Sequence, residues 1–598
     1  MKISRIYSNL PKVFEPIDFV VGLNVVVAEI RLPENKDRDT HNLGKSTLGR
    51  LIDFLLLTKK SSKFFLFKHE AVFQDFVFFA ELELSPNRFL TIRRSVKEGS
   101  KASFKISENR GCDYSSLEPK DWDHYDIAFE KSKLLLDGYL AWDAISPWTY
   151  RNVLGYFLRT QEDYQDVFQL RKFAGAHSDW KPLLAHILGF NAEAISAQYS
   201  KEEDLSKING KISELTAELE GDNTDVSTLE GLLQLKRAET TALEKQLEEF
   251  DFRTSDDETS EKLVSEIDIK IAALNSRKYS LSKSRKRVQD ALEEDRITFS
   301  IKQAEELLSE AKIVFEGQLR HDYEQLIDFN KKITKERRGF LKEELSEIDG
   351  DLSEIKKELA ALGNSRSEAL SYLSETQPFE KYKELSASLV DLRTEIESLE
   401  AKKERRAELQ SLKATSRKLE DEKRKLDDSV ETDVTTQNTD DSSLFSKIRR
   451  YFDEIVYSVV GRHALLSVSA NSESHLEFRA SFLDAEAKVT SADAGSSYKR
   501  LLCVAFDLSV LRAHLGQGFP RFAFHDGVFE TLDPRKKQKL LHVLREYSNL
   551  GLQLITTTID TELPQRDDGE GPAVNSDEII LTLHDEGQEG RLFKMSTW

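Results

Sequence analysis

The chain has 598 residues, a formal net charge of −20 and 32% charged residues. This negative charge disfavours nonspecific adhesion to nucleic acid or to a membrane surface, so any contact with DNA requires a local basic patch. The two cysteines, Cys112 and Cys503, lie too far apart for a CxxC zinc motif, and a disulfide framework is not expected. No run approaches the ~18 apolar residues of a transmembrane helix, and no secretory signal pattern opens the sequence. We therefore expect a cytoplasmic protein without a membrane partner.

A Gly-Lys-Ser-Thr motif at residues 44–47 lies between an apolar stretch that predicts a strand and an apolar run that predicts a helix. This is the setting of a phosphate-binding loop, where Lys45 reaches the β- and γ-phosphates and the Ser46 hydroxyl ligates Mg²⁺. The usual pattern has a glycine five residues before Gly44, where this chain has Asp39. Asn42 is a substitute for one missing glycine, because Asn enters the left-handed region more readily than most residues. The motif alone is a partial match.

Residues 1–192 have a mixed α/β pattern, and residues 193–428 change to heptad periodicity. One seam alternates spacings of three and four through Leu341, Leu345, Ile348, Leu352, Ile355 and Leu359. With charged residues at most other positions, this pattern predicts a coiled coil, and a globular helical bundle is the alternative. If the two halves pair antiparallel, the apex lies near residues 300–320.

Two basic clusters, at residues 283–287 and 331–338, lie almost equidistant from that apex. An antiparallel hairpin would bring them together as a DNA-binding patch, whereas the alternative is two solvated charged faces. The candidate DNA-contacting residues are Arg285, Lys286, Arg287, Lys335, Arg337 and Arg338. The arm is followed by an acidic, Thr-rich stretch at residues 429–443, which predicts a flexible linker.

An α/β pattern returns in residues 444–598, and it supplies the residues that a phosphate loop needs as partners. An apolar strand ends at Asp526, which is positioned to hold Mg²⁺, and Asp533 follows seven residues later. Upstream, Gly495 and Ser496 precede a helix, where small residues suit a contact with phosphate. Taken singly, each has an ordinary alternative, a capping acid or a surface loop. Their order along the chain favours one split ATPase.

With these motifs in this order, the whole chain resembles coiled-coil ABC ATPases of the SMC, RecN and SbcC group. More narrowly, it resembles the ATPase subunit of bacterial ABC-three-component defence systems, which overlap with Lamassu-type systems, and the stretches that carry this are 156–169, 180–189, 498–508, 525–537 and 590–598. The resemblance implies an α/β ABC-type ATPase head assembled from N- and C-terminal lobes, with a long antiparallel coiled-coil arm inserted between them. It also implies head-to-head dimerisation around ATP and Mg²⁺, sensing of double-stranded DNA or DNA ends, and a separate effector such as a nuclease with a small accessory subunit from the same operon.

The same resemblance assigns roles to individual residues. The nucleotide would contact Asn42, Gly44, Lys45, Ser46, Thr47, Gln161, Gly495, Ser496 and Asp533, and the metal would contact Ser46, Gln161 and Asp526. Two departures concern catalysis. Gly527 stands where the family has its catalytic Glu, and residues 556–560 lack the usual switch His.

A carboxylate must position the attacking water, so either Glu530 does this from the next turn or hydrolysis is slow. The resulting interpretation is an ATP-gated DNA sensor in bacterial defence against phage or plasmids. The alternatives are a RecN-like repair ATPase and a coiled-coil scaffold with a degenerate head.

Overall fold

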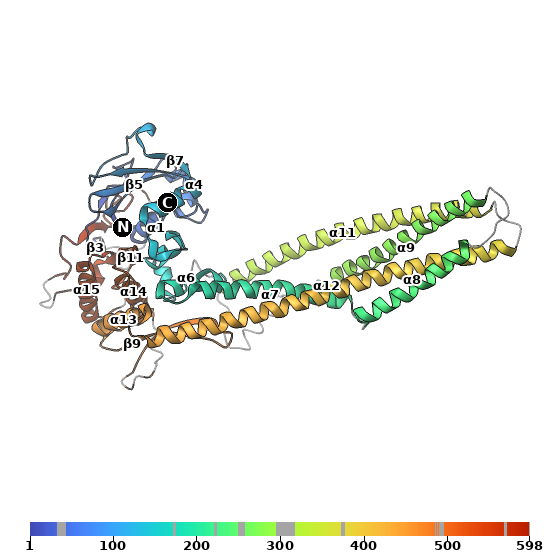
Figure 1. Cartoon of the computed structure of the whole chain (residues 1–598). Helices are drawn as coiled ribbons and strands as arrows, with labels where there is room; N and C mark the ends of the chain where they lie inside the picture. The colour runs from blue at the N-terminus through green and yellow to red at the C-terminus, as the bar shows by residue number, and fades with distance from the viewer. Residues whose placement is uncertain are drawn as a thin grey trace. The chain divides into compact units, whose positions relative to one another are not determined.

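The computed structural model of the chain (Figure 1) describes residues 1–32, 43–170, 175–219, 224–248, 257–294, 317–371, 377–484, 486, 488, 496–530, 532–566, 571–596 and 598. Its internal contacts divide the chain into two units. The head unit comprises Met1–Leu205 and Leu419–Trp598, and the helical unit comprises Ser206–Lys418. No helix among these residues has the length and apolarity needed to cross a membrane.

A five-stranded parallel sheet in the head unit has the strand order β13-β3-β12-β11-β8. The strands are β3 (Leu23–Glu29), β8 (Leu158–Arg159), β11 (Phe522–Asp526), β12 (Gln553–Ile559) and β13 (Ile579–His584). All five residues of β11 are buried, as expected of a central parallel strand covered on both faces. Because β3 and β8 precede the helical unit in sequence and the other strands follow it, the sheet requires both lobes. The predicted head, assembled from N- and C-terminal lobes, is thereby confirmed.

Helix α1 (Lys45–Leu55) packs on this sheet through Leu48, Leu51, Ile52 and Leu55, which are buried at helical spacing. A Cβ on Gly49 would lie 2.5 Å from Phe524 Cε1, so the glycine allows α1 to approach β11 closely. This approach places the first turn of α1 beside the end of β11. Helices α14 (Ser496–Ala513) and α15 (Pro534–Asn549) precede β11 and β12, respectively.

The remainder of the head unit contains two antiparallel sheets and several helices. The six-stranded sheet has the order β2-β1-β4-β5-β6-β7, with strands β1 (Lys2–Ser8), β2 (Ile17–Asp18), β4 (Val77–Ser85), β5 (Arg88–Ser95), β6 (Lys101–Ser107) and β7 (His124–Ala128). The two-stranded sheet joins β9 (Ala464–Ala470) to β10 (Leu476–Phe482). The other helices of eight residues or more that lie wholly in this unit and are described include α4 (Phe129–Leu140), α6 (His177–Leu188) and α13 (Leu444–Val460).

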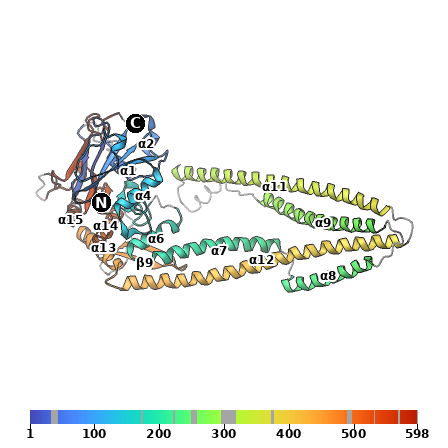
Figure 2. The same ribbon diagram turned by 45° about the horizontal axis from the view of Figure 1, so that its top comes forward.

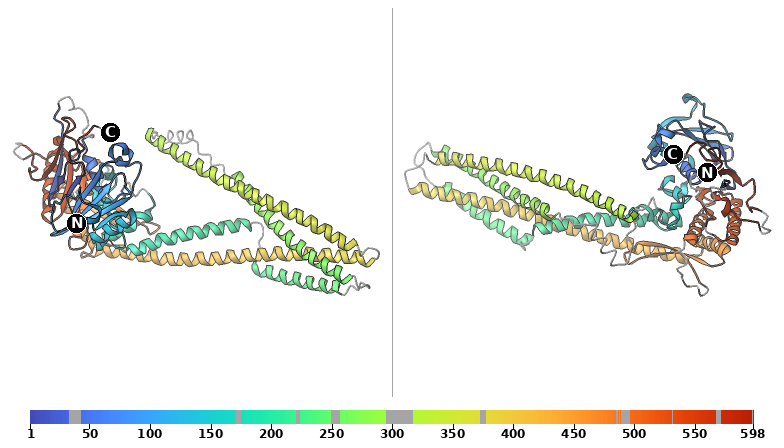
Figure 3. Two further views of the ribbon diagram at one scale, coloured as in Figure 1. Left: turned by 90° about the horizontal axis from the view of Figure 1, so that it is seen from above. Right: turned by 180° about the vertical axis from the view of Figure 1, so that it is seen from behind.

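The helical unit confirms the predicted coiled-coil helices and their antiparallel pairing. Its elements are α7 (Ala192–Glu218), α8 (Val226–Glu248), α9 (Asp257–Glu294), α11 (Gly317–Ser371) and α12 (Gln377–Thr439), of which α7 and α12 continue into the head unit. Helix α8 pairs with α12, for example through Arg237 and Glu400 at 2.5 Å. Helix α9 pairs with α11, for example through Arg285 and Asp349 at 2.5 Å. Figures 2 and 3 show these two pairs.

The direction of α9 differs from the single long hairpin that we expected. Val264, near the start of α9, packs in one apolar cluster with Leu247 at the end of α8. Arg287, near the other end of α9, pairs with Glu218 at the end of α7. Helix α9 therefore runs antiparallel to α8, whereas a simple hairpin would run both in one direction. Residues 300–316 of the expected apex lie outside the described residues.

Residues 429–439 form the last turns of α12, so the predicted linker at 429–443 was wrong. Val430 and Val434, four residues apart, are buried in the head core. The hydroxyls of Thr432, Thr435, Thr436 and Thr439 each donate to the carbonyl four residues earlier. The composition suggested disorder, but the segment is helical and packs into the head core through two buried valines on one helical face.

Candidate active site

Gly44 is the N-cap of α1 and has a left-handed conformation, with φ of 108° and ψ of 12°. A Cβ there would lie 2.6 Å from Leu592 Cβ, and the Leu592 N–H donates to the Leu43 carbonyl at 3.1 Å. Both the backbone angle and the close contact therefore require glycine. The predicted contact residue Asn42 lies outside the described residues.

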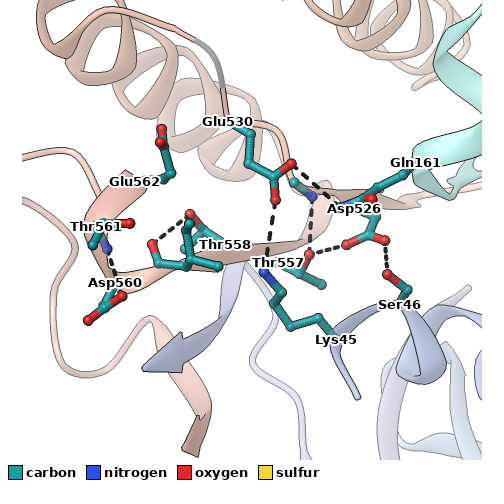
Figure 4. Close-up of polar contacts among 12 residues, drawn as sticks. Lys45, Ser46, Gln161, Asp526, Glu530, Thr557, Thr558, Asp560, Thr561 and Glu562 are labelled. Carbon is teal, nitrogen blue, oxygen red and sulfur yellow. Dashed lines mark hydrogen bonds and ion pairs between the residues drawn. The ribbon is translucent and has the colours of Figure 1, made fainter. Parts of the chain in front are cut away.

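Asp526 ends β11 and is completely buried. The Ser46 hydroxyl donates to Asp526 Oδ2 at 2.5 Å, and the Thr557 hydroxyl of β12 donates to Oδ1 (Figure 4). Two hydroxyls from different elements thus fix the plane of this carboxylate. The structure brings together the Ser46 and Asp526 that the sequence predicted as metal ligands, and it adds Thr557.

Lys45 is the first residue of α1 and is only 5% exposed. Its Nζ lies 3.9 Å from Glu530 Oε1. Burial lowers the pKa of Lys45 below its usual value, while three nearby carboxylates act in the opposite direction, those of Glu530, Asp526 and Asp560. A buried ammonium at a helix N-terminus is suited to a polyphosphate, which would add negative charge and donor-matched oxygens.

Glu530 lies beside Asp526 and Lys45 (Figure 4), and its side chain is 22% exposed. Its Oε2 accepts from Arg500 at 3.1 Å and lies at 3.5 Å, the limit of a hydrogen bond, from Gln161 Nε2. A Cβ on Gly527, where φ is 69°, would lie 2.7 Å from the Glu530 carboxyl carbon. The carboxylate of Glu530 therefore fills the space next to residue 527.

Gln161 opens a short 3₁₀ turn, η6 (Gln161–Tyr164), directly after β8. Thr160 and Asp163 form a capping box around this turn, with the Asp163 carboxylate accepting from the Thr160 backbone N–H at 3.0 Å. The turn directs Gln161 toward Glu530, and its contact with a nucleotide stays a prediction. Its role as a metal contact stays a prediction.

Of the other predicted nucleotide contacts, Asp533 caps a helix, and Gly495 and Ser496 are not fully described. Asp533 is the N-cap of α15 and accepts from the Lys536 backbone N–H at 3.1 Å. The Lys536 ammonium lies 2.6 Å from the Asp533 carboxylate and lowers its pKa. Ser496 is the first residue of α14, but its side chain and Gly495 lie outside the described part of the chain.

A pocket of about 290 Å³ lies beside the start of α1. It is lined by Leu43, Gly44, Thr47, Arg50, Lys63, Phe65, Lys68, His69, Arg591, Leu592, Phe593 and Trp598. Four of these residues are lysine or arginine, one is histidine, and none is acidic. Ser46 faces Asp526 while Thr47 lines this pocket, so two sides of the first turn of α1 present different chemistry.

Sequence reasoning did not identify Arg500 or Thr557 as site residues. Thr557 belongs to β12, and only the pairing of β12 with β11 places its hydroxyl beside Asp526. Arg500 follows the Gly495-Ser496 motif by one helical turn, and this spacing was the available signal. Its partner Glu530 is 30 residues away, and only the fold brings the two together.

The predicted DNA-contacting residues do not form one cluster among the described side chains. Arg285 pairs with Asp349, Arg287 pairs with Glu218, and Lys286 is exposed. Arg338 is exposed and lies about three turns before Asp349 on α11, roughly 16 Å at about 1.5 Å per residue. The side chains of Lys335 and Arg337 lie outside the described ones. DNA contact by these residues stays a prediction.

Comparison with known proteins gives one family model and several solved structures. A model for uncharacterised proteins conserved in bacteria, DUF2326, matches residues 453–597, and no curated protein matches the chain. One similar structure is the Smc head domain with a coiled coil and joint from Pyrococcus yayanosii, with 15% identity, 99% of this chain and 96% of that chain covered, and a TM-score of 0.37. Another is the Smc head domain with an extended coiled coil bound to the C-terminal domain of ScpA from Pyrococcus furiosus, with 11% identity, 94% and 90% covered, and a TM-score of 0.31.

Proposed function

We propose that the chain is a coiled-coil ABC-type ATPase that binds ATP and Mg²⁺ between the start of α1 and the end of β11. The observation that supports this most directly is the position of Lys45 and Ser46 against Asp526 and Glu530. These pairs come from opposite ends of the sequence and from elements that the parallel sheet holds together. A buried lysine, a hydroxyl and two carboxylates at a helix N-terminus are the groups that phosphoryl transfer uses.

The residues present fit Mg²⁺. Ser46 Oγ and Asp526 Oδ2 already lie 2.5 Å apart, and Thr557 orients the carboxylate. Mg²⁺ commonly takes one or two protein oxygens and completes its shell with water and substrate phosphates. When bound here it would neutralise charge on the β- and γ-phosphates. Ser46 and Asp526 would hold it, with Gln161 at the edge of the site.

Different parts of the nucleotide would contact different sides of the first turn of α1. Lys45 would pair with the β- and γ-phosphates on the side of Glu530, and the basic pocket beside Thr47 would receive the rest of the nucleotide. Glu530 would orient the attacking water and accept its proton. A carboxylate within hydrogen-bonding distance of that water can perform this role from position 530 as well as from position 527. Gly527 keeps the adjacent space open for it.

We also propose the finer biological role that the sequence resemblance implies. In this account two heads close around ATP, with Gly495 and Ser496 of one copy contacting the nucleotide of the other. The coiled-coil protein would then respond to foreign double-stranded DNA or DNA ends and control a separate effector in bacterial defence. The match of residues 453–597 to a family conserved in bacteria is compatible with this role.

The ATP-binding proposal is tested by calorimetry with ATP and Mg²⁺ on the Lys45→Ala variant. We expect binding to be lost, while Lys59→Ala, which removes an exposed lysine of the same lobe, leaves it unchanged. Undiminished affinity in Lys45→Ala would refute the assignment. If the wild-type protein itself binds no ATP, the scaffold with a degenerate head is the better account.

The defence role is tested by purifying the protein with its operon neighbours and measuring assembly in the presence and absence of ATP and DNA ends. We expect ATP- and DNA-dependent assembly with an effector. A gene neighbourhood without an effector, together with an assembly that ignores DNA ends, would favour the repair ATPase.

A further inference from the structure

We propose that Arg500 is the positioning residue for Glu530, and that it makes the position of this carboxylate depend on helix α14. The inference rests on the proposed ATPase function. It concerns a residue that has no role in the motifs described above.

Arg500 makes two hydrogen bonds to the turn that carries Glu530. One guanidinium nitrogen, Nη1, donates to the Gly527 carbonyl at 2.5 Å and to Glu530 Oε2 at 3.1 Å. The side chain is 17% exposed, and its guanidinium carbon lies 5.1 Å from the centre of the Tyr164 ring. Tyr164 belongs to the same 3₁₀ turn as Gln161. Arg500 thus links α14 to the end of β11 and to the turn after β8.

This contact compensates for the unusual place of the carboxylate. A Glu directly after the β11 aspartate would be held by the strand, whereas Glu530 reaches back from three residues later through a flexible side chain. The Glu530 backbone N–H donates to the Gly527 carbonyl at 3.2 Å, and Arg500 grips the same carbonyl together with the carboxylate. Catalytic groups require placement to within about 0.5 Å, and a displacement of about 1 Å costs on the order of 100-fold in rate.

The two oxygens of Glu530 face different cations. Oε1 lies 3.9 Å from Lys45 Nζ, and Oε2 lies 3.1 Å from Arg500. A polyphosphate would compete for Lys45, which leaves Oε1 available to a water on the phosphate side. Arg500 would keep hold of Oε2 during this exchange. Oε2 would therefore position the carboxylate through Arg500, while Oε1 would contact the attacking water.

Helix α14 carries a second inward-facing polar residue two turns later, on the same face. Asp507 Oδ2 accepts a hydrogen bond from Arg159 Nε at 2.7 Å and lies 3.0 Å from His525 Nε2. All three side chains are buried. Asp507 anchors α14 to the sheet, and Arg500 stands between this anchor and the first residue of the helix. A displacement of the start of α14, the end proposed to meet the ATP of a second copy, would therefore move Arg500 and with it Glu530.

The test compares Arg500→Gln and Arg500→Lys with Arg512→Gln in the full-length protein. Arg512 is on the same helix, pairs with Glu454 at 3.0 Å and stacks 3.9 Å from the Tyr451 ring centre, so its loss controls for damage to α14. For Arg500→Gln we expect kcat to fall by about 100-fold with the Kd for ATP changed less than about threefold. Arg500→Lys should recover part of the rate, and Arg512→Gln should keep it.

A purely structural role is distinguished by repeating Arg500→Gln in the Glu530→Gln background. If Arg500 acts through Glu530, the second substitution has no further effect on the single-turnover rate. An equal fall in both backgrounds, or full activity of Arg500→Gln alone, would overturn the inference. Loss of ATP binding by the wild-type protein or its persistence in Lys45→Ala would instead refute the proposed function, so the two failures are distinguishable.

Discussion

Two arginine–carboxylate pairs hold helix α14, and they differ in burial and in completeness. Arg159 and Asp507 are both 0% exposed and form two hydrogen bonds, at 2.7 and 2.9 Å. Arg159 also donates to the carbonyls of Asp163, Asp166 and Val167. Arg500 and Glu530 are partly exposed, and Arg500 contacts the Glu530 carboxylate through Nη1. Arg500 Nε is buried without a hydrogen-bond partner in the described structure.

The difference indicates which pair is fixed and which can change. Burial lowers the pKa of Arg159, and Asp507 more than reverses this, leaving it above its usual value. Breaking such a pair strands a buried charge, so it is expected to persist in every state of the head. The Arg500–Glu530 pair is reached by solvent and lies beside Lys45. We therefore regard Arg159–Asp507 as a permanent anchor and Arg500–Glu530 as the adjustable contact, which stays formed but moves with the start of α14.

The largest expected effect is on stability, from Asp507→Ala. This variant leaves Arg159 charged, buried and without its carboxylate, which costs about 3–5 kcal/mol. Arg500→Gln breaks a partly exposed pair and is expected to cost about 1 kcal/mol or less. Equilibrium unfolding in urea measures both. Equal destabilisation of the two variants would remove the distinction between anchor and adjustable contact.

Gly527→Ala tests the adjustable contact by a steric clash, without a change in charge. Its Cβ would meet the Glu530 carboxylate at 2.7 Å, so we expect the carboxylate to be displaced and hydrolysis to fall by about 100-fold with ATP binding retained. Gly461→Ala is the matched control, because Gly461 has a similar φ of 73° and no atom within 4 Å of the added Cβ. It should carry only the backbone strain of about 1–2 kcal/mol. Equal effects of both variants on hydrolysis would contradict the proposed packing.

The lowered pKa of Lys45 predicts proton uptake when ATP binds. Between this lowered pKa and the usual value of about 10.4, Lys45 is largely neutral in the free protein, and phosphates would restore its charge. Over the same range the unfolded chain binds more protons, so the contribution of Lys45 to folding stability becomes less unfavourable as pH rises. Calorimetry in buffers of different ionisation enthalpy measures the uptake. An enthalpy independent of buffer in this range would show that Lys45 does not change charge.

The smallest expected effect is on the reactivity of Cys503, which lies on α14 beside the anchor. Burial raises the pKa of this thiol to about 12, and its Sγ lies 3.6 Å from the Asp166 carbonyl. In a Cys112→Ser background we expect slow alkylation that Asp507→Ala accelerates and Arg500→Gln does not. Mass spectrometry over time gives the rates. Acceleration by Arg500→Gln would indicate that Arg500 also anchors the helix.

The sequence predicted the head well because its motifs have fixed places in one topology. The Gly-Lys-Ser-Thr motif after a strand and an aspartate at the end of an apolar strand are brought together by the parallel sheet, and Ser46 is hydrogen-bonded to Asp526. The coiled-coil helices followed from heptads in the same way, whereas their antiparallel pairing followed from the return of the chain to a second lobe. Here local patterns carried the relevant information.

Other features depend on distances that local patterns do not contain. The reversed direction of α9 arises where Leu247, Val264 and Leu389 cluster, and no heptad count reveals which helix ends meet. Glu530 was predicted only as one of two possibilities, since its reach across the turn depends on the left-handed Gly527. Arg500 was missed because a basic residue on a helix is ordinarily a solvated charge.

We propose that Glu530 performs the role of the carboxylate that is absent at Gly527. Single-turnover ATP hydrolysis by Glu530→Gln, with ATP affinity measured in parallel, tests it most directly. We predict an affinity close to that of the wild type and a rate lowered by about 100-fold or more, while Glu546→Gln, at an exposed position of α15, keeps the wild-type rate. An unchanged hydrolysis rate in Glu530→Gln would contradict the claim.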